Sequence, residues 1–224
     1  MITPQKLKCF SLFSTLSEKD LEPLLPYLIV RHYRKGQILF VEGEIGSLVY
    51  FVLSGQIKLS KTLPDGNEQI LDWCGPNDSL AEILLIEPGP YPATAEVIQE
   101  SQLLILPNEK IPDLLVRNPQ IAVALIRTLS KRLRLNQEFI RILTSRSTAG
   151  ILAALLLRLA QPAAHSSEPI FVDGTLTHKD LASMIGTSRE LVNRSINSWK
   201  RQGIIRLQDS RLEILKPLEL ADWP

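Results

Sequence analysis

Residues 176–207 read LTHKDLASMIGTSRELVNRSINSWKRQGIIRL, and this stretch decides the fold of the C-terminal part of the chain. Thr177 stands three residues before Asp180, a spacing typical of a helix start, because the hydroxyl can accept a backbone N–H left unpaired in the first turn. Gly186 adopts a positive φ without strain and so predicts a tight turn after this helix. Gly203 is placed for a left-handed cap at the end of a second helix. The stretch therefore predicts two short helices joined by a turn.

The second helix is predicted to begin at Thr187, which fits a capping box with Glu190. At about 100° per residue its apolar residues fall on one side and its polar residues on the other. The apolar side holds Val192, Ile196 and Trp199. The polar side carries Arg189, Glu190, Asn193, Arg194, Asn197 and Lys200.

This polar face suits the major groove of DNA, where arginine forks onto guanine O6 and N7 and a carboxylate accepts from cytosine N4. Between Thr177 and Arg206 six Lys/Arg stand against two Asp/Glu, a local excess that phosphate contacts need. The alternative is a helical hairpin whose charged residues merely face solvent. The residues expected to contact DNA are Thr177, His178, Lys179, Thr187, Ser188, Arg189, Glu190, Asn193, Arg194 and Lys200.

The segment Ser188–Arg194, SRELVNR, resembles the recognition helix of the Crp–Fnr family, the cyclic-AMP receptor branch in particular. Its Ser-Arg-Glu opening and its later arginine match that branch residue by residue. The resemblance implies a homodimeric transcription factor that binds a palindromic operator with a GTGA-like half-site. In that site Arg189 and Arg194 would meet guanines, and Glu190 would accept from cytosine.

The hydrophobic pattern of the N-terminal half differs from that of the two helices. Between residues 30 and 107, short alternating runs are separated by glycine turns, which predicts the strands of an antiparallel roll or barrel. A helix-like segment, Glu82–Ile86, interrupts them. Their order resembles the family's cyclic-nucleotide-binding β-roll, so the resemblance covers nearly the entire chain. After the two helices, the runs Ile204–Leu207 and Leu212–Leu215 predict a hairpin wing.

A long helix is predicted between these parts. Asn118-Pro119 marks its start, and neither Gly nor Pro interrupts residues 120–143. We expect this helix to pair with a second copy of itself, as the family's dimer helix does; the alternative is an amphipathic helix packed on its own β-roll. The residues that repeat at three-and-four spacing along it are Ala122, Leu125, Leu129, Arg132, Asn136, Phe139 and Leu143.

The predicted fold class is therefore α+β, with an antiparallel, jelly-roll-like β-roll, a long dimerisation helix and a C-terminal winged helix-turn-helix. The predicted domains are an effector-sensing β-roll over residues 1–117, the central helix over 118–143 and the DNA-binding domain over 144–224. A hinge is predicted at residues 144–147 and a loop at residues 161–169.

The expected effector pocket departs from the family's cyclic-AMP binders, which carry Gly-Glu and, further on, Arg-Ser. Aligned on this pattern, Ala81 takes the glycine position and Glu82 that of the acid that holds the ribose, while Arg-Ser falls on Pro92 and Ala93. Proline offers neither a charge nor a backbone donor to a cyclic phosphate. We expect an effector other than cyclic AMP, or none. The pocket residues implied are Leu80, Ala81, Glu82, Pro92, Ala93, Asn136 and Gln137.

The alternative is that Arg117 or Arg132 replaces the arginine that the cyclic-AMP binders carry at the position of Pro92.

The composition indicates the general class of protein and its compartment. The chain has 224 residues, 45% of them hydrophobic, and a net charge of +1, which describes a globular protein. Its two cysteines, Cys9 and Cys74, lie far apart in the sequence, which indicates a reducing compartment and no disulfide scaffold. No signal peptide or membrane-length apolar run is found, so we expect a cytoplasmic protein with no membrane partner.

An enzyme is not indicated. His32, His165 and His178 belong to no metal-ligand or nucleophile–base spacing, and no phosphate-binding glycine loop occurs, so we expect neither catalysis nor a metal or cofactor. Haem ligation by His32 or Cys74 has no supporting pattern. The expected partners are double-stranded DNA, a second copy, RNA polymerase and an unidentified small-molecule effector. The other function considered is a ligand-binding interaction module with a repurposed helix-turn-helix.

Overall fold

The computed structural model describes residues 2–145, 147–160, 170–172, 176–208 and 211–224. The chain forms two compact units, residues 1–134 and 135–224, and the boundary between them falls within helix α4 (Pro119–Ser145). None of the described helices is both long enough and apolar enough to span a membrane.

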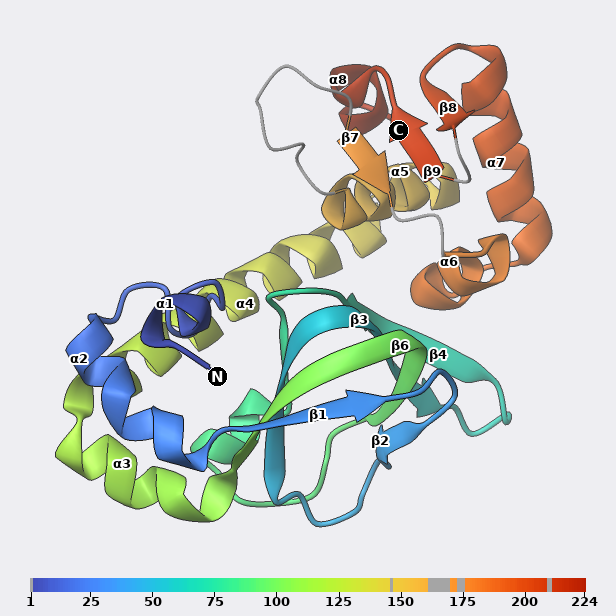
Figure 1. Cartoon of the computed structure of the whole chain (residues 1–224). Helices are drawn as coiled ribbons and strands as arrows, with labels where there is room; N and C mark the ends of the chain where they lie inside the picture. Colours follow the sequence, from blue (N-terminus) through green and yellow to red (C-terminus); the bar gives the residue numbers. More distant parts are fainter. Residues whose placement is uncertain (1, 146, 161–169, 173–175, 209–210) are drawn as a thin grey trace. The chain divides into compact units, whose positions relative to one another are not determined.

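The first unit is built on one antiparallel sheet (Figure 1). Four strands follow the order β1-β6-β3-β4, while β2 pairs with β6 and β5 pairs with β3. The prediction of an antiparallel β-roll is thereby confirmed. The strands are β1 (Ile29–Tyr33), β2 (Ile38–Phe40), β3 (Leu48–Thr62), β4 (Glu68–Cys74), β5 (Ser79–Leu80) and β6 (Thr94–Pro107).

The long strands β3 and β6 change register where Gly55 passes Ser101. Gly55 has φ +89°, and a Cβ at this position would lie 2.1 Å from the Ser101 Oγ. Ser101 Oγ accepts from the Gln56 N–H at 3.1 Å and donates to the Gln99 carbonyl at 2.6 Å. Only glycine therefore fits this crossing, since any side chain would meet both strain and backbone atoms.

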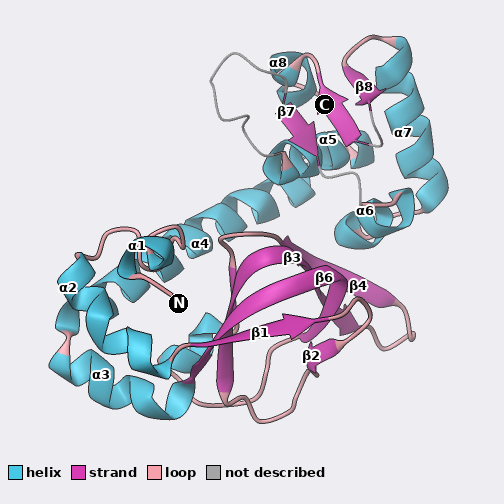
Figure 2. Cartoon of the chain, in the orientation of Figure 1, coloured by secondary structure: helices cyan, strands magenta, loops and turns pink. Residues whose placement is uncertain are grey.

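Helices gather beside one end of this sheet, as Figure 2 shows in cyan. The Ser17–Asp20 capping box begins α2, with Ser17 Oγ accepting from the Asp20 N–H at 3.3 Å. The rings of Phe10 and Phe13 contact the ring of Phe51 on β3, with centroids 5.2 and 5.1 Å apart. The helical segments of this unit are α1 (Pro4–Leu7), α2 (Glu18–Leu21), η1 (Glu22–Tyr27), η2 (Glu82–Leu85), η3 (Asn108–Lys110) and α3 (Ile111–Arg117), together with most of α4.

The predicted start of the long helix is confirmed, but its predicted dimer face is wrong at Leu125. Leu125 is buried in the core of the first unit, and Leu129 packs against that core. Thr128, on the same face, donates to the Ser11 carbonyl at 3.5 Å. This part of α4 therefore packs on its own β-roll, the alternative considered above. The side chains of Arg132, Phe139 and Leu143 lie outside the described part.

The second unit is a small sheet, β7-β9-β8, packed with helices around Trp199. The predicted wing is confirmed as the antiparallel pair β8–β9, to which β7 adds a third strand. Arg146 in the predicted hinge, the predicted loop at 161–169 and the wing's turn at 209–210 lie outside the described residues. The elements are α5 (Thr148–Leu159), β7 (Ile170–Val172), α6 (His178–Ile185), α7 (Arg189–Arg201), β8 (Ile205–Gln208), β9 (Arg211–Ile214) and α8 (Pro217–Ala221).

Candidate functional site

The first helix of the helix-turn-helix, α6, begins as predicted. Thr177 Oγ1 accepts from the Asp180 N–H at 3.2 Å, and the Asp180 carboxylate accepts from the Thr177 N–H at 2.8 Å. Gly186 ends the helix with φ +68°, as predicted for the turn. The residues expected to meet DNA here are therefore held on a doubly capped first turn: Thr177 and Lys179 are exposed, and His178 is half-buried.

The N-cap of the second helix, α7, lies one residue later than predicted. Ser188, not Thr187, is its N-cap, and Ser188 Oγ accepts from the Leu191 N–H at 3.3 Å. The predicted capping box is wrong because the Thr187 N–H donates to the Ala182 carbonyl at 3.0 Å and so closes the preceding helix. Arg189 and Glu190 consequently occupy the first two positions of α7, where a recognition helix presents its base-contacting residues.

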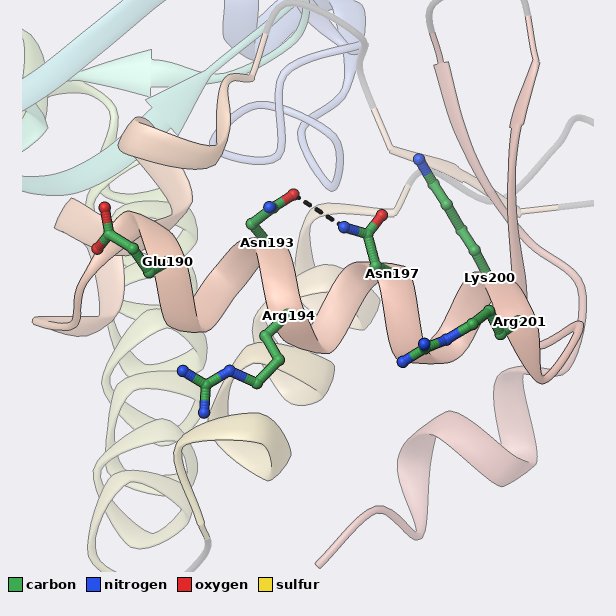
Figure 3. Close-up of a pocket in the computed structure, with 6 residues that line it drawn as sticks. All are labelled: Glu190, Asn193, Arg194, Asn197, Lys200 and Arg201. Carbon is green, nitrogen blue, oxygen red and sulfur yellow. Dashed lines mark hydrogen bonds between the residues drawn. The ribbon is translucent and has the colours of Figure 1, made fainter.

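The two faces of α7 are separated as predicted. Val192, Ile196 and Trp199 are buried in the core of the second unit. The opposite face is exposed polar surface, and six of its side chains line one pocket (Figure 3). These residues are Glu190, Asn193, Arg194, Asn197, Lys200 and Arg201.

Two of these lining residues, Asn197 and Arg201, are not among the expected DNA contacts. Helical periodicity alone could have found both, since Asn197 follows Asn193 by four positions and Arg201 follows Arg194 by seven. Of the expected contacts, Arg189 and Ser188 are also exposed, while Thr187 is half-buried in the turn. The structure thus collects the predicted residues of α7 on one surface and extends that surface toward the helix C-terminus.

The charge state of this face suits base and phosphate contacts. The pKa of Glu190 lies below its ordinary value because its carboxylate accepts a hydrogen bond from its own backbone N–H and another from Ser188, with Arg189 adding an attractive charge. Glu190 is therefore an ionised acceptor at neutral pH, on the same face of α7 as the cations Arg194, Lys200 and Arg201. Burial lowers the pKa of His178, and the charges of Lys200 and Arg189 lower it further.

The wing contains an ion pair between an exposed arginine and a buried carboxylate, which the sequence did not indicate. Glu213 on β9 is buried, with a side chain 2% exposed, and accepts from Arg206 Nε at 2.6 Å. Arg206 Nη2 also donates to Gln208 on the same strand at 3.0 Å. An unpaired buried carboxylate is costly, so this pairing fixes the Arg206 side chain against the wing.

The expected effector residues fall into two groups. Leu80, Glu82 and Ala93 are buried in the first unit, Ala81 is half-buried, and Pro92 is exposed. Asn136 and Gln137 are exposed residues of the second unit, so they are not placed against the other five.

Ala81 has φ +60°, a left-handed conformation that a non-glycine residue rarely adopts. This is the position that the alignment gave to a glycine. A glycine would adopt this conformation without strain.

The segment before Pro92 is held by Tyr91. The ring of Tyr91 stacks on Phe40 with centroids 4.0 Å apart, and its hydroxyl donates to the Leu48 carbonyl at 3.2 Å. Backbone hydrogen bonds tie it to the facing loop, from the Tyr91 N–H to Glu44 O at 2.8 Å and from the Gly43 N–H to Tyr91 O at 3.0 Å. On the alignment given above, Pro92, next to this aromatic stack, takes the position of the arginine of the cyclic-AMP binders. Among the described residues, no cluster of three or more His, Cys, Asp and Glu could hold a metal ion.

Comparisons with known proteins match both units. Residues 30–118 match the family model of a cyclic nucleotide-binding domain, and residues 152–223 match that of a Crp-like helix-turn-helix domain. The chain is 30% identical over 190 residues to the CRP-like cAMP-activated global transcriptional regulator of Mycobacterium tuberculosis, spanning 84% of this chain and 85% of that protein. It is 30% identical over 208 residues to the cyclic AMP receptor protein of Thermus thermophilus, spanning 93% and 94%. The solved structure of FixK2 from Bradyrhizobium japonicum shares the fold, with a TM-score of 0.75 at 22% identity over 86% of this chain and 95% of that one.

Proposed function

Since this chain belongs to the Crp–Fnr family of transcription regulators, which are not enzymes, we propose that it is a homodimer that reads a two-fold symmetric operator. We propose further that its effector is not cyclic AMP. The observation that carries the DNA-binding role is the exposed polar face of α7, opposite a fully buried apolar face.

Base reading is assigned to the first half of α7. Arg189 and Arg194 carry guanidinium groups that fork onto guanine, and the ionised Glu190 accepts from cytosine N4. Thr177, His178 and Lys179 at the start of α6, with Lys200 near the end of α7, contact phosphates and set the register. The turn residues Thr187 and Ser188 bring Arg189 to the base edges.

Dimerisation is assigned to an exposed apolar stripe of α4, which we call the α4 stripe. It consists of Val123, Ile126 and Leu133, at 40%, 59% and 59% exposure. Spacings of three and seven residues are those of a coiled-coil seam. A copy of the same helix covers such a stripe along its length. With two recognition helices related by a two-fold axis, the half-sites lie about 34–36 Å apart, one helical turn of DNA.

Effector control is assigned to the β-roll. The named relatives from Mycobacterium tuberculosis and Thermus thermophilus are cAMP-activated or cyclic AMP receptor proteins, but this chain has Pro92 and Ala93 where the cyclic-AMP cassette carries Arg-Ser. Charge-assisted hydrogen bonds to a phosphate are each worth roughly 1.5–3 kcal/mol, so their loss weakens a cyclic nucleotide strongly. The effector therefore has no phosphate group that needs this arginine, or the protein acts without an effector.

The organisation that follows has three parts: an effector-sensing β-roll over residues 1–117, a dimer helix over 118–143 and a DNA-binding domain over 144–224. An effector that binds the DNA-competent state more tightly shifts the population toward that state. RNA polymerase is the expected protein partner, and the cytoplasm is the expected compartment.

The test is selection of bound sequences from a random DNA library by the full-length protein, with and without an extract of cell metabolites. The expected result is a palindromic consensus with a GTGA-like core in each half. A steep fall of affinity with salt should accompany it. Binding without sequence preference would contradict the proposal and favour an interaction module.

A further inference from the structure

Two asparagines on the exposed face of α7 are joined by a side-chain hydrogen bond. Asn197 Nδ2 donates to Asn193 Oδ1 at 3.1 Å, one helical turn earlier, and both side chains are exposed. Figure 3 shows the two amides pointing toward each other. Both residues line the same surface as Glu190 and Arg194.

We propose that Asn193 reads an adenine in the half-site and that Asn197 is the positioning residue that holds the Asn193 amide in register for it. This inference rests on the proposed DNA-binding function and adds a specificity determinant to it. Asparagine reads adenine by accepting from N6 and donating to N7.

The hydrogen bond leaves those reading groups available. The Asn193 carbonyl oxygen has two lone pairs, so it accepts from Asn197 and from adenine N6 together. Its amide nitrogen keeps both N–H groups, one of which donates to adenine N7. An isolated exposed asparagine can also turn its amide over and present the opposite pattern. The bond from Asn197 selects the orientation in which the oxygen faces along the helix toward Asn197.

The position of the pair along α7 says which base pair it meets. Asn193 lies three residues beyond Glu190, about 4.5 Å along the helix axis at 1.5 Å per residue. Base pairs in B-DNA are spaced about 3.4 Å apart. Asn193 therefore meets the base pair next to the one that Glu190 reads, while Asn197 lies a further turn along.

The experiment compares base preferences of full-length wild type, Asn193→Ala, Asn197→Ala and the double variant, each profiled against a library of single-base changes in the selected operator. Gln202→Ala is the matched control, because it removes another exposed side-chain hydrogen bond between residues four apart, from Gln202 Nε2 at the C-cap of α7 to Ser198 Oγ at 3.0 Å. Circular dichroism checks that each variant is folded.

Asn193→Ala is expected to lower the preference for adenine at one base pair by about 5- to 100-fold. Asn197→Ala is expected to lower it at the same base pair by about fivefold, the worth of one ordinary hydrogen bond. The double variant should then equal Asn193→Ala alone, since the positioning residue has nothing left to position. Asn193→Asp, which keeps shape but loses the donors, should change the preference there from adenine to cytosine.

Three outcomes overturn the inference: an unchanged preference in Asn193→Ala, an effect of Asn197→Ala at a different base pair, or an effect of Gln202→Ala equal to that of Asn197→Ala. In each of these cases a wild type that still selects its operator leaves the proposed function intact. A wild type without any base preference would overturn both.

Discussion

Leu125 and Ile126 are neighbours on helix α4, yet Leu125 is 1% exposed and Ile126 is 59% exposed. The first side chain belongs to the core of its own β-roll, and the second belongs to the α4 stripe, which continues to Leu133. Residues seven apart share a helix face, so Ile126 and Leu133 lie on one side of α4, whereas Leu125 lies on another. The α4 stripe and the core face are therefore distinct surfaces of one helix. Substitutions on the two surfaces should therefore have different consequences.

Replacing Ile126 or Leu133 by Glu should convert the dimer to a monomer while the fold persists. A charge in an apolar seam is buried without a partner on association, which is costly, whereas in the monomer it faces water. Analytical ultracentrifugation gives the oligomeric state, and operator binding should fall with it because one half-site alone is weak.

Leu125→Ala is the comparison. It should lower the free energy of unfolding by about 2–5 kcal/mol through a cavity in the core, with the dimer retained at low temperature. A dimer that survives both Ile126→Glu and Leu133→Glu would place the interface elsewhere.

Arg189→Ala should weaken the selected operator by about 1–3 kcal/mol and relax base choice at one position, since it removes a bidentate contact to guanine. Lys179→Ala should instead weaken all sequences about equally and reduce the salt slope by about one. Fluorescence anisotropy with operator and random DNA over a range of salt separates the two patterns. Equal losses on both DNAs for Arg189→Ala would refute its role in base reading.

Much of the fold and the DNA face could be predicted because local rules act within a few residues. The Thr177 capping box, the Gly186 turn and the apolar side of α7 follow from spacing alone and are confirmed. The prediction of the α7 N-cap was wrong because Thr187 could serve either of two helices. Thr187 could cap α7, but its N–H closes α6, so the cap passes to Ser188.

Tertiary partners set the remaining differences. Leu125 carries the same periodic signal whether a second copy or its own β-roll covers it, so periodicity could not choose between them. The Arg206–Glu213 pair joins two strands through side-chain reach, for which the sequence holds no local signal. The left-handed Ala81 likewise depends on the surrounding roll, because its residue type alone argues against that conformation.

Calorimetric titration of the wild type with cyclic AMP and with cyclic GMP should give no saturable heat at micromolar concentrations. The position that would need a cation is Pro92, and the neighbouring Tyr91 is stacked on Phe40 at 4.0 Å. Loss of the arginine's paired hydrogen bonds should weaken a cyclic nucleotide by at least about 10- to 100-fold.

The double substitution Pro92→Arg with Ala93→Ser supplies the missing groups and is the matched gain-of-function variant. Measurable binding by this variant and not by the wild type would support the assignment. Stoichiometric, micromolar binding of either nucleotide by the wild type would show that another cation, such as Arg117, has taken over.

DNA binding should be accompanied by proton uptake at His178. His178 is the first residue of α6, and its pKa is lowered from 6.5 by burial and then by the charges of Lys200 and Arg189. In the free protein it is therefore neutral at neutral pH. A DNA phosphate beside it favours the imidazolium and raises the pKa, so the complex binds protons that the free protein does not.

The sign follows from linkage: because the pKa is higher in the complex than in the free protein, affinity rises as pH falls from above the bound pKa to below the free pKa, and levels off below it. Anisotropy titrations at constant ionic strength should show up to about one proton taken up per protomer across that window. His178→Gln keeps a donor for the phosphate but cannot titrate, so its affinity should be nearly flat over the same range. A pH slope unchanged in His178→Gln would assign the proton uptake to another group and remove His178 from the phosphate contact.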